Sequence, residues 1–337
     1  PEDARIRHRQ IPALLDAGWD VTYLAPPGDL TAAPAKLQRI EVPRASGRRR
    51  LAALRDARRE LRRVSPTADL TVIHDPELLL ATGVVDGPVI WDVHEDLVAQ
   101  IADKAWIPAP LRGVAASAAR MLQRRGQHLP RTIAETGYAA EHPDATLVRN
   151  TVVVPSDVGP TGDDRVVYLG RVSSGRGAAL LGAVAELLPD DVTVDVIGHL
   201  DDRLSLPPVV RSRGFVPNDI ALGEVAGATA GLSLLRDLPN YRHSLPTKIL
   251  EYLSRGVPVI STPLAAAVEV VSGHECGIIV PFDDPEAVAE AILSLRADPD
   301  ERERLGRKGH AAVTEHYRWR DDSARRIGFY ESVARAR

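Results

Sequence analysis

The chain has 337 residues, of which 44% are hydrophobic and 26% are charged, and its net charge at pH 7 is −4. These values exclude a disordered chain and argue against generic nucleic-acid binding, and the length suits two domains of about 150 residues each. No apolar run reaches the roughly 20 residues of a membrane-spanning helix, and the single cysteine, Cys276, excludes an internal disulfide. The single cysteine favours a reducing compartment, and no secretory signal is visible in the given residues, so we expect a cytoplasmic location.

The chain opens with a helical pattern and not with a strand. Apolar residues at helical spacing over 6–15 end before Gly18, and a strand pattern follows at 21–25. An α/β domain normally begins with a strand and a loop. We therefore expect such a strand to precede the given residues.

Residues 47–63 form a basic helical segment with eight arginines and two acids. Arginine-rich helices usually present a solvated face, and the narrow apolar stripe favours that interpretation. The alternative is peripheral contact with anionic lipid or with a pyrophosphate-lipid acceptor.

Two histidines end the strands predicted at 69–74 and 89–94. Because ligands collect at the carboxyl ends of parallel strands, His74 and His94 are both candidates for a site. The sequence 74–77 is also typical of a polar turn that caps a helix beginning at Glu77. A zinc site built from these histidines and nearby acids has unfavourable spacing.

A linker rich in Pro and Gly is predicted at 150–162, and a second α/β domain follows it. A strand at 165–171 leads into a Gly-rich turn, 170–177, and then into an apolar helix, 178–188. Such a turn is a phosphate cradle by geometry, and Arg171 and Arg176 add forked donors. The fingerprints of dinucleotide-binding and ATP-binding loops are both absent from it.

The second domain continues with alternating strands and helices. Strands are predicted at 192–198, 230–235, 257–260 and 277–280, and helices at 285–295, 301–316 and 319–336. In the first domain, a helix is predicted at 111–125 and strands at 132–134 and 146–148. The fold class is therefore α/β, with two Rossmann-like domains.

The most informative stretch is 241–262. A polar loop leads to Pro246, apolar residues at helical spacing follow it, and Gly256 stops the helix before a strand. Ser244, Thr247, Lys248 and Glu251 cluster around the first turns, where free backbone amides favour an anion. The alternative is an ordinary amphipathic helix with a solvated lysine and a surface glutamate.

This stretch resembles the donor-binding segment of glycosyltransferase family 4, the retaining sugar-nucleotide transferases. Residues 244–252 are similar to the form Ser-x-Pro-x-Lys-x-x-Glu-Tyr, and 256–260 match Gly-x-Pro-Val-Ile. The first glutamate of the family pattern falls on His243, which is a departure. The Gly-rich turn resembles the family's Gly-Arg-x-x-x-x-Lys-Gly, with Arg176 in place of the lysine.

The resemblance extends along nearly the whole chain. The sequence around His94 and the segment 104–108 resemble one bacterial branch of this family. In the family, the histidine at the position of His94 contacts the donor sugar or the reacting centre. Asp3 and Arg5 fall at the edge of the loop that lies across the donor diphosphate and acceptor. Residues 213–217 resemble the segment whose backbone pairs with the nucleotide base.

This resemblance implies a GT-B fold, in which two domains face a cleft. It divides the chain into an acceptor-side domain (1–152), a linker (153–163), a nucleotide-sugar domain (164–316) and a helix that crosses back (317–337), anchored by Trp319 and Tyr330. It implies transfer of a sugar, with retention, from a UDP- or GDP-type donor to a glycan, lipid-linked or small-molecule acceptor. No metal or cofactor is expected, because cationic side chains and helix N-termini would stabilise the departing diphosphate.

The implied site residues have three roles. The catalytic group is His94, Arg171, Arg176 and Lys248. The donor nucleotide group is Gly170, Arg171, Arg176, Gly198, Val216, Ser244, Leu245, Thr247, Lys248 and Glu251. The donor-sugar or acceptor group is His94, Asp3, Arg5 and His243.

Two other functions remain open. A nucleotide-sugar 2-epimerase uses a similar fold but needs acid and base groups on both sides of the sugar. A non-catalytic GT-B scaffold or activator subunit is favoured by His243 and disfavoured by the cationic residues and Glu251. No opposed carboxylate pair is evident, which argues against a glycosidase.

Overall fold

The computed structural model describes residues 5–28, 36–45, 49–94, 98, 109–202 and 204–336. The chain divides into two compact units, unit 1 (Pro1–Asn150 with Arg320–Arg337) and unit 2 (Thr151–Trp319). Asp3, the acids that follow His94 and the segment 104–108 lie outside the described residues. Within the described ranges, no helix combines the length and the apolar character needed to cross a membrane.

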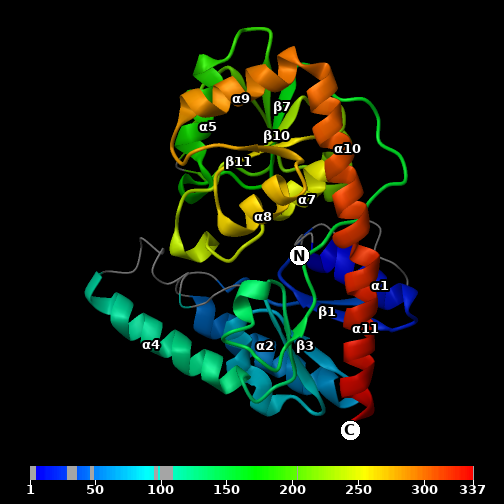
Figure 1. The fold of residues 1–337 in the computed structure, drawn as a ribbon. Helices are drawn as coiled ribbons and strands as arrows, with labels where there is room; N and C mark the ends of the chain where they lie inside the picture. Colours follow the sequence, from blue (N-terminus) through cyan, green and yellow to red (C-terminus); the bar gives the residue numbers. More distant parts are fainter. Residues whose placement is uncertain are drawn as a thin grey trace. The chain divides into compact units, whose positions relative to one another are not determined.

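Unit 1 is an α/β unit with two parallel sheets (Figure 1). The smaller sheet pairs β1 (Val21–Ala25) with β2 (Leu37–Glu41). The larger has the order β3-β4-β5-β6, with the bounds Thr71–Ile73, Val89–Val93, Arg131–Ile133 and Thr146–Leu147. Strand β4 is buried along its whole length, as expected of a central parallel strand that is covered on both faces.

The helices of unit 1 pack against these strands. Gly126, at the end of α4, lies so close to the ring of Trp91 that a Cβ there would be 2.3 Å from it. The last helix, α11, belongs to unit 1 from Arg320 onward. The elements are η1 (Ile6–Gln10), α1 (Ile11–Asp16), α2 (Arg50–Val64), η3 (Ser65–Thr67), η4 (Pro76–Val84), α4 (Ala109–Gly126), η5 (Thr136–Tyr138) and α11 (Trp319–Arg335).

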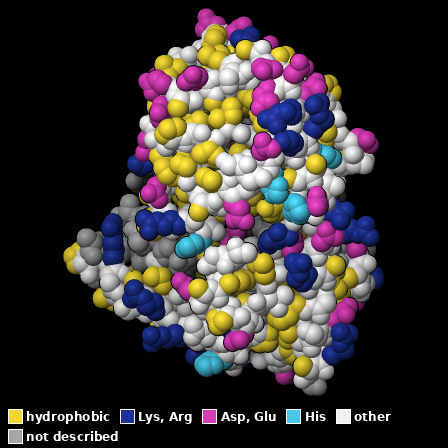
Figure 2. Space-filling view, in the orientation of Figure 1, with side chains coloured by type: hydrophobic (Ala, Val, Ile, Leu, Met, Phe, Trp, Pro, Cys, Tyr) yellow, Lys and Arg dark blue, Asp and Glu magenta, His cyan; other side chains and the backbone are white. Residues whose placement is uncertain are grey.

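Two helices give unit 1 a basic surface. The arginines of α2 include Arg55 and Arg59, which are largely exposed and lie beside Asp56. This matches the favoured interpretation of a solvated face. Helix α4 contains no acidic residue and exposes Val114 and Met121. Figure 2 shows Lys and Arg side chains over the region of α4.

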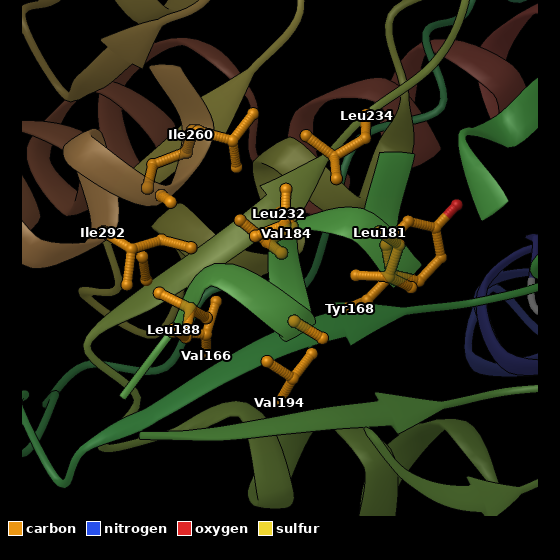
Figure 3. Close-up of a cluster of buried hydrophobic side chains, with 14 of the residues drawn as sticks. Val166, Tyr168, Leu181, Val184, Leu188, Val194, Leu232, Leu234, Ile260 and Ile292 are labelled. Carbon is orange, nitrogen blue, oxygen red and sulfur yellow. The ribbon is translucent and has the colours of Figure 1, made fainter. Parts of the chain in front are cut away.

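Unit 2 is a three-layer α/β unit around one parallel sheet with the order β12-β11-β10-β7-β8-β9. Alternate residues of β7 point to opposite faces. Val166 and Tyr168 join one buried cluster with α5 and α9, while Val167 and Leu169 join another with α6, α7 and α8. Figure 3 shows the first cluster, and Figure 1 the helices on the two sides of the sheet.

The order of the strands reverses between β7 and β10, because the chain runs outward from β7 to β8 and β9, and outward from β10 to β11 and β12. This is the switch point at which parallel sheets bind ligands. The strands are β7 (Arg165–Leu169), β8 (Thr193–Ile197), β9 (Val210–Gly214), β10 (Ala230–Ser233), β11 (Val259–Ser261) and β12 (Gly277–Ile279). The helices are η6 (Ser174–Arg176), α5 (Ala178–Leu187), α6 (Asn218–Val225), η7 (Pro239–Tyr241), α7 (Thr247–Leu253), α8 (Ala265–Gly273), α9 (Pro285–Ala297) and α10 (Pro299–His316).

The chain passes between the units twice, and the two passages lie beside each other in unit 2. The amide of Val152 donates to the carbonyl of Tyr317, and the amide of Trp319 donates to the carbonyl of Val152. Trp319 and Tyr330, the expected anchors of the last helix, are both buried.

The structure corrects two predicted helix starts. Pro246 has φ −60° and ψ 116°, so it is extended and α7 begins one residue later, at Thr247. The segment after Asp75 is a 3-10 helix and not an α-helix, with i→i+3 bonds such as that from the amide of Leu78 to the carbonyl of Asp75. Strands β2 and β9 and helices α6 and α8 were not predicted.

Candidate functional site

The Gly-rich turn after β7 lies at the switch point and requires glycine at two positions. Gly177 has φ +86°, and a Cβ there would lie 2.0 Å from the carbonyl oxygen of Leu234. A Cβ at Gly198, after β8, would lie 2.2 Å from the carbonyl oxygen of Gly170. The turn is therefore held against the loop that follows β10 and against the end of β8.

The loop after β10 closes over the same turn. The amide of Arg236 donates to the carbonyl of Gly175 at 3.1 Å, and Leu238 and Tyr241 are the nearest side chains to that glycine. This loop then delivers Ser244, Leu245 and Thr247, which are half-buried, to the start of α7. The predicted turn and the predicted loop therefore do lie together. His243, by contrast, is exposed.

Lys248 is a buried cation at this place. Its Nζ lies 3.5 Å from the centre of the Tyr168 ring and has no hydrogen-bond partner among the described residues. Burial lowers the pKa of Lys248 well below its usual value, the nearby charge of Arg176 lowers it further, and Glu251 acts in the opposite direction. The free protein thus disfavours the charged form of this lysine.

Helix α7 presents both of its charged residues to the interior. Lys248 and Glu251 are each only 7% exposed, so the alternative of a solvated lysine and a surface glutamate is wrong. Tyr252 ties the helix to the sheet, since its hydroxyl accepts from the amide of Leu169 at 2.7 Å and donates to the carbonyl of Leu232 at 3.1 Å. The helix is therefore fixed at the point where the strand order reverses.

The two predicted arginines have different environments. Arg171 points to Asp201, with its Nε 2.5 Å from the carboxylate, and this hydrogen bond raises the pKa of Arg171. Arg176 is half-buried and lies close enough to Lys248 to lower the pKa of that lysine. Its backbone carbonyl accepts the Tyr168 hydroxyl at 2.8 Å. The structure thus brings Arg176 to Lys248, while Arg171 is held by an acid.

Val216 is half-buried and packs against the cluster that contains α7. Its neighbour Phe215 is 63% exposed. The segment thus presents an aromatic side chain to solvent while its valine packs against the core.

In unit 1, both predicted histidines lie at the carboxyl edge of the larger sheet. His74 follows β3 and His94 follows β4, and their ring centres are 6.4 Å apart. The Nδ1 atom of His94 lies 3.2 Å from the backbone oxygen of Asp92, and the Nδ1 atom of His74 lies 3.0 Å from an Asp92 carboxylate oxygen.

Asp92 was not predicted as a functional residue, yet it is the centre of the polar network of unit 1. It is fully buried in β4 and its pKa is held well below the usual range. Burial alone would raise that pKa, but the charges of Arg326 and Arg5 and the hydrogen bond from His74 outweigh it. Its carboxylate contacts Arg5 Nη1 at 3.0 Å, Gln10 Nε2 at 3.2 Å, His74 Nδ1 at 3.0 Å, Thr132 Oγ1 at 2.7 Å and Arg326 Nη1 at 3.4 Å.

One signal in the sequence could have identified Asp92. It is the acid in the otherwise apolar strand Val89–Val93, and a carboxylate in a buried strand requires cationic or hydrogen-bonding partners. Arg5, predicted at the edge of an acceptor loop, is one of these partners. Among the described residues, no group of three or more His, Cys, Asp or Glu side chains is placed to hold a metal ion.

Comparison with known proteins identifies similar chains. The family model of "Glycosyl transferases group 1" matches residues 163–298. The phosphatidyl-myo-inositol mannosyltransferase of Mycobacterium leprae is 27% identical over 286 residues, which are 79% of this chain and 74% of the relative.

Solved structures share the fold. Sucrose-phosphate synthase from Thermosynechococcus elongatus superposes with a TM-score of 0.76 at 16% identity, covering 96% of this chain and 92% of that one. Anabaena HepE in complex with UDP-glucose gives a TM-score of 0.66 at 14% identity, with 88% and 86% covered. The expectation of a GT-B fold is thus confirmed, and the chain is a GT-B glycosyltransferase that carries the group 1 glycosyl transferase match in unit 2.

Proposed function

We propose that this glycosyltransferase moves a sugar from a nucleoside diphosphate sugar to an acceptor hydroxyl, and that unit 2 binds the donor. The observation that carries the proposal is Lys248, a buried lysine that has no hydrogen-bond partner among the described residues and lies near Arg176. A buried cation without a partner is unfavourable, and an anionic diphosphate would compensate it.

The chemistry of the reaction explains the composition of this site. When the sugar leaves, negative charge develops on the diphosphate. Lys248, Arg176 and the amides of the glycine turn are the groups that stabilise it, without a metal ion. Each well-placed donor of this kind contributes about 3 kcal/mol to the lowering of the barrier. Glu251 holds the ribose hydroxyls, and the backbone at Val216 holds the base.

The remaining residues of the donor nucleotide group line the donor site or contact the donor. Gly170 and Gly198 let the backbone approach the diphosphate, and Ser244, Leu245 and Thr247 form the loop above it. Arg171 binds the phosphates after it releases the carboxylate of Asp201. In unit 1, His94, Arg5 and Asp3 serve the sugar or the acceptor, and in unit 2 His243 takes part in recognising the sugar.

The donor and acceptor classes belong to the same proposal. We favour a UDP- or GDP-type donor, retention of configuration, and a glycan, lipid-linked or small-molecule acceptor. The UDP-glucose bound to HepE and the name of the mycobacterial mannosyltransferase support these classes. A cytoplasmic location belongs to the proposal, and in the alternative interpretation the arginines of α2 contact an anionic membrane surface.

Calorimetry tests the donor site directly. The protein is titrated with UDP, GDP, ADP and TDP in the presence of EDTA, and the same titrations are made with Lys248→Met and Glu251→Ala. Lys308→Met is the matched control, since Lys308 forms an ion pair with Glu275 at the surface of unit 2. We expect micromolar binding of one nucleotide, loss of binding in both site variants, and unchanged binding in the control.

The other outcomes are equally informative. Binding of no nucleotide to the unmodified protein would overturn the proposal and favour a non-catalytic scaffold. Nucleotide binding that depends on a divalent metal would contradict the proposal that Lys248 and Arg176 stabilise the diphosphate in place of a metal ion. Binding that survives both Lys248→Met and Glu251→Ala would place the nucleotide elsewhere.

A further inference from the structure

Tyr168 contacts both Lys248 and Arg176, the two residues whose charges stabilise the diphosphate in the proposed function. The centre of its ring lies 3.5 Å from Nζ of Lys248, and its hydroxyl donates to the backbone carbonyl of Arg176 at 2.8 Å. The side chain is completely buried, and burial raises the pKa of its hydroxyl, so the hydroxyl remains protonated and can donate. One residue of β7 is thus bonded to both parts of the site.

Lys248 and Tyr168 belong to opposite faces of the sheet. Tyr168 joins the buried cluster that includes α5 and α9, and Figure 3 shows its side chain within that cluster. Ile249 and Leu250, the neighbours of Lys248 in α7, join the cluster on the other face. The side chain of Lys248 therefore reaches over the carboxyl end of β7 to place its ammonium group on the ring.

The packing of α7 fixes the position of the ammonium group relative to the ring. Tyr252 lies one turn after Lys248, and its hydroxyl accepts from the amide of Leu169 at 2.7 Å. A Cβ at Gly231 would lie 2.3 Å from the Tyr252 ring, so this glycine lets the helix approach the sheet closely. Because Leu169 follows Tyr168 in β7, the helix that carries the lysine is attached to the strand that carries the ring.

The ring also favours the charged form of Lys248. Burial lowers the pKa of this lysine, the charge of Arg176 lowers it further, and Glu251 acts in the opposite direction. The face of an aromatic ring attracts a cation, and the attraction is stronger where water is excluded. Nζ of Lys248 has no hydrogen-bond partner among the described residues, so the ring stabilises the ammonium group while N–H donors are left for an anion.

We propose that Tyr168 is a positioning residue of the donor site, which holds the ammonium group of Lys248 with its ring and the backbone of Arg176 with its hydroxyl. Both cationic residues are thereby set to bind the same diphosphate. Because Tyr168 is completely buried, it acts through these two residues and not by contact with the donor. This inference rests on the proposed function, since it presupposes that unit 2 binds the diphosphate.

A simpler interpretation is that Tyr168 only fills the core beneath the glycine turn. A core residue affects the free energy of unfolding. A positioning residue also affects the ionisation of Lys248 and the affinity for a nucleoside diphosphate. The effect on ionisation depends on the ring alone, so phenylalanine should preserve it and leucine should not.

The test uses the full chain with two variants and a matched control. Tyr168→Phe keeps the ring and removes the hydrogen bond to Arg176, and Tyr168→Leu removes both. Ile292→Ala is the control, because Ile292 is a completely buried member of the same cluster, on α9, and has no part in the donor site (Figure 3). Calorimetry with UDP, GDP, ADP and TDP measures the affinity, and urea unfolding measures the stability of each variant.

We expect Tyr168→Leu to weaken nucleotide binding by about 50-fold, of which about tenfold comes from the ring and about fivefold from the hydroxyl. Tyr168→Phe should therefore weaken binding by only about fivefold. Ile292→Ala should lower the stability of unit 2 and keep the Kd of the unmodified protein.

The ionisation of Lys248 gives a second readout that needs no nucleotide. The sequence contains four lysines, so ¹³C NMR of the lysine Cε atoms gives few resonances, and the one that is absent from Lys248→Met belongs to Lys248. We expect a pH titration to show a lower pKa of Lys248 in Tyr168→Leu than in the unmodified protein. In Tyr168→Phe the pKa should be unchanged.

The outcomes separate this inference from the proposed function. If the unmodified protein binds a nucleotide and Tyr168→Leu binds it with the same Kd, the positioning role is overturned while the donor site stands. An unchanged pKa of Lys248 in Tyr168→Leu overturns it as well, and so does an equal weakening of binding in Ile292→Ala. If no nucleotide binds, the donor site fails and the positioning role falls with it.

Discussion

The two units each bury an ionisable side chain at the carboxyl edge of a parallel sheet, but they differ in the partners that surround it. In unit 1, the carboxylate of Asp92 contacts Arg5, Gln10, His74, Thr132 and Arg326. In unit 2, the ammonium group of Lys248 has the ring of Tyr168 beneath it and no hydrogen-bond partner among the described residues. The carboxylate has several hydrogen-bonding and cationic partners, whereas the ammonium group has only the ring of Tyr168 and the charge of Glu251.

This difference supports the proposed place of the donor. A buried ion is tolerated only when partners replace its lost hydration. Asp92 has such partners, so the network around it can stabilise the fold and orient His74 without any bound molecule. Lys248 lacks them, and its lowered pKa reflects that lack. In the proposed function, the anion that completes the site in unit 2 is the diphosphate of the donor.

The largest effect is expected from removal of the compensated charge. Asp92→Ala leaves the buried guanidinium of Arg326 without its carboxylate, so the free energy of unfolding should fall by about 3–5 kcal/mol. Urea unfolding with a probe in unit 1, such as the fluorescence of the buried Trp91, measures it. Asp191→Ala, which breaks a surface ion pair with Arg296, should have little effect.

The same carboxylate predicts an acid dependence. Because the pKa of Asp92 is lower in the folded protein, its contribution to stability is present above the unfolded value of about 3.9 and is lost as the pH falls below it. The variant should lack this part of the acid destabilisation. A loss of less than about 1 kcal/mol at neutral pH would contradict the view that the network is a paired buried ion.

A smaller effect, with the opposite sign for stability, is expected at Lys248. Lys248→Met removes an uncompensated buried charge and keeps the length of the side chain, so unit 2 should become more stable by about 1 kcal/mol. Nucleotide binding should weaken by about 2 kcal/mol, or roughly 30-fold in Kd. Thermal unfolding with and without nucleotide measures both changes. If the variant is destabilised instead, Lys248 is compensated within the free protein and the comparison fails.

Much of unit 2 was predictable from the sequence because its strands are short β-branched runs punctuated by glycine. Strand β11, the stop at Gly256 and helix α7 follow directly from that pattern. Helix α8 was missed because its run of alanines and valines has little amphipathic periodicity. Strand β9, Val210–Gly214, was missed because polar and charged residues fill an edge strand that is largely exposed.

The residues of the candidate sites also divide into those that the sequence predicts and those that it does not. Motif positions such as Lys248 and Glu251 were predicted, but their burial was not, because a lysine and a glutamate in a first helical turn are usually solvated. The Asp92 network could not be predicted, since its partners come from positions as distant as Gln10 and Arg326 and only the tertiary fold brings them together. Tyr168 falls in the strand predicted at 165–171, and its contact with Lys248 depends on the side-chain packing.

The smallest expected effect is the uptake of a proton when a nucleotide binds. It is also the most specific test of the charge on Lys248. In the free protein the pKa of Lys248 lies well below its usual value because of burial and the charge of Arg176. A bound diphosphate supplies the missing negative charge and raises that pKa. Between the two pKa values the free lysine is neutral and the bound lysine is charged, so nucleotide binding should take up as much as one proton, and binding should weaken as the pH rises through that window. Calorimetry at several pH values between the unperturbed pKa values of histidine and lysine, in buffers of different ionisation enthalpy, measures the proton directly. The uptake should disappear in Lys248→Met and persist in Lys308→Met. Binding with no proton exchange at any pH between the unperturbed values of histidine and lysine would mean that Lys248 is already charged in the free protein.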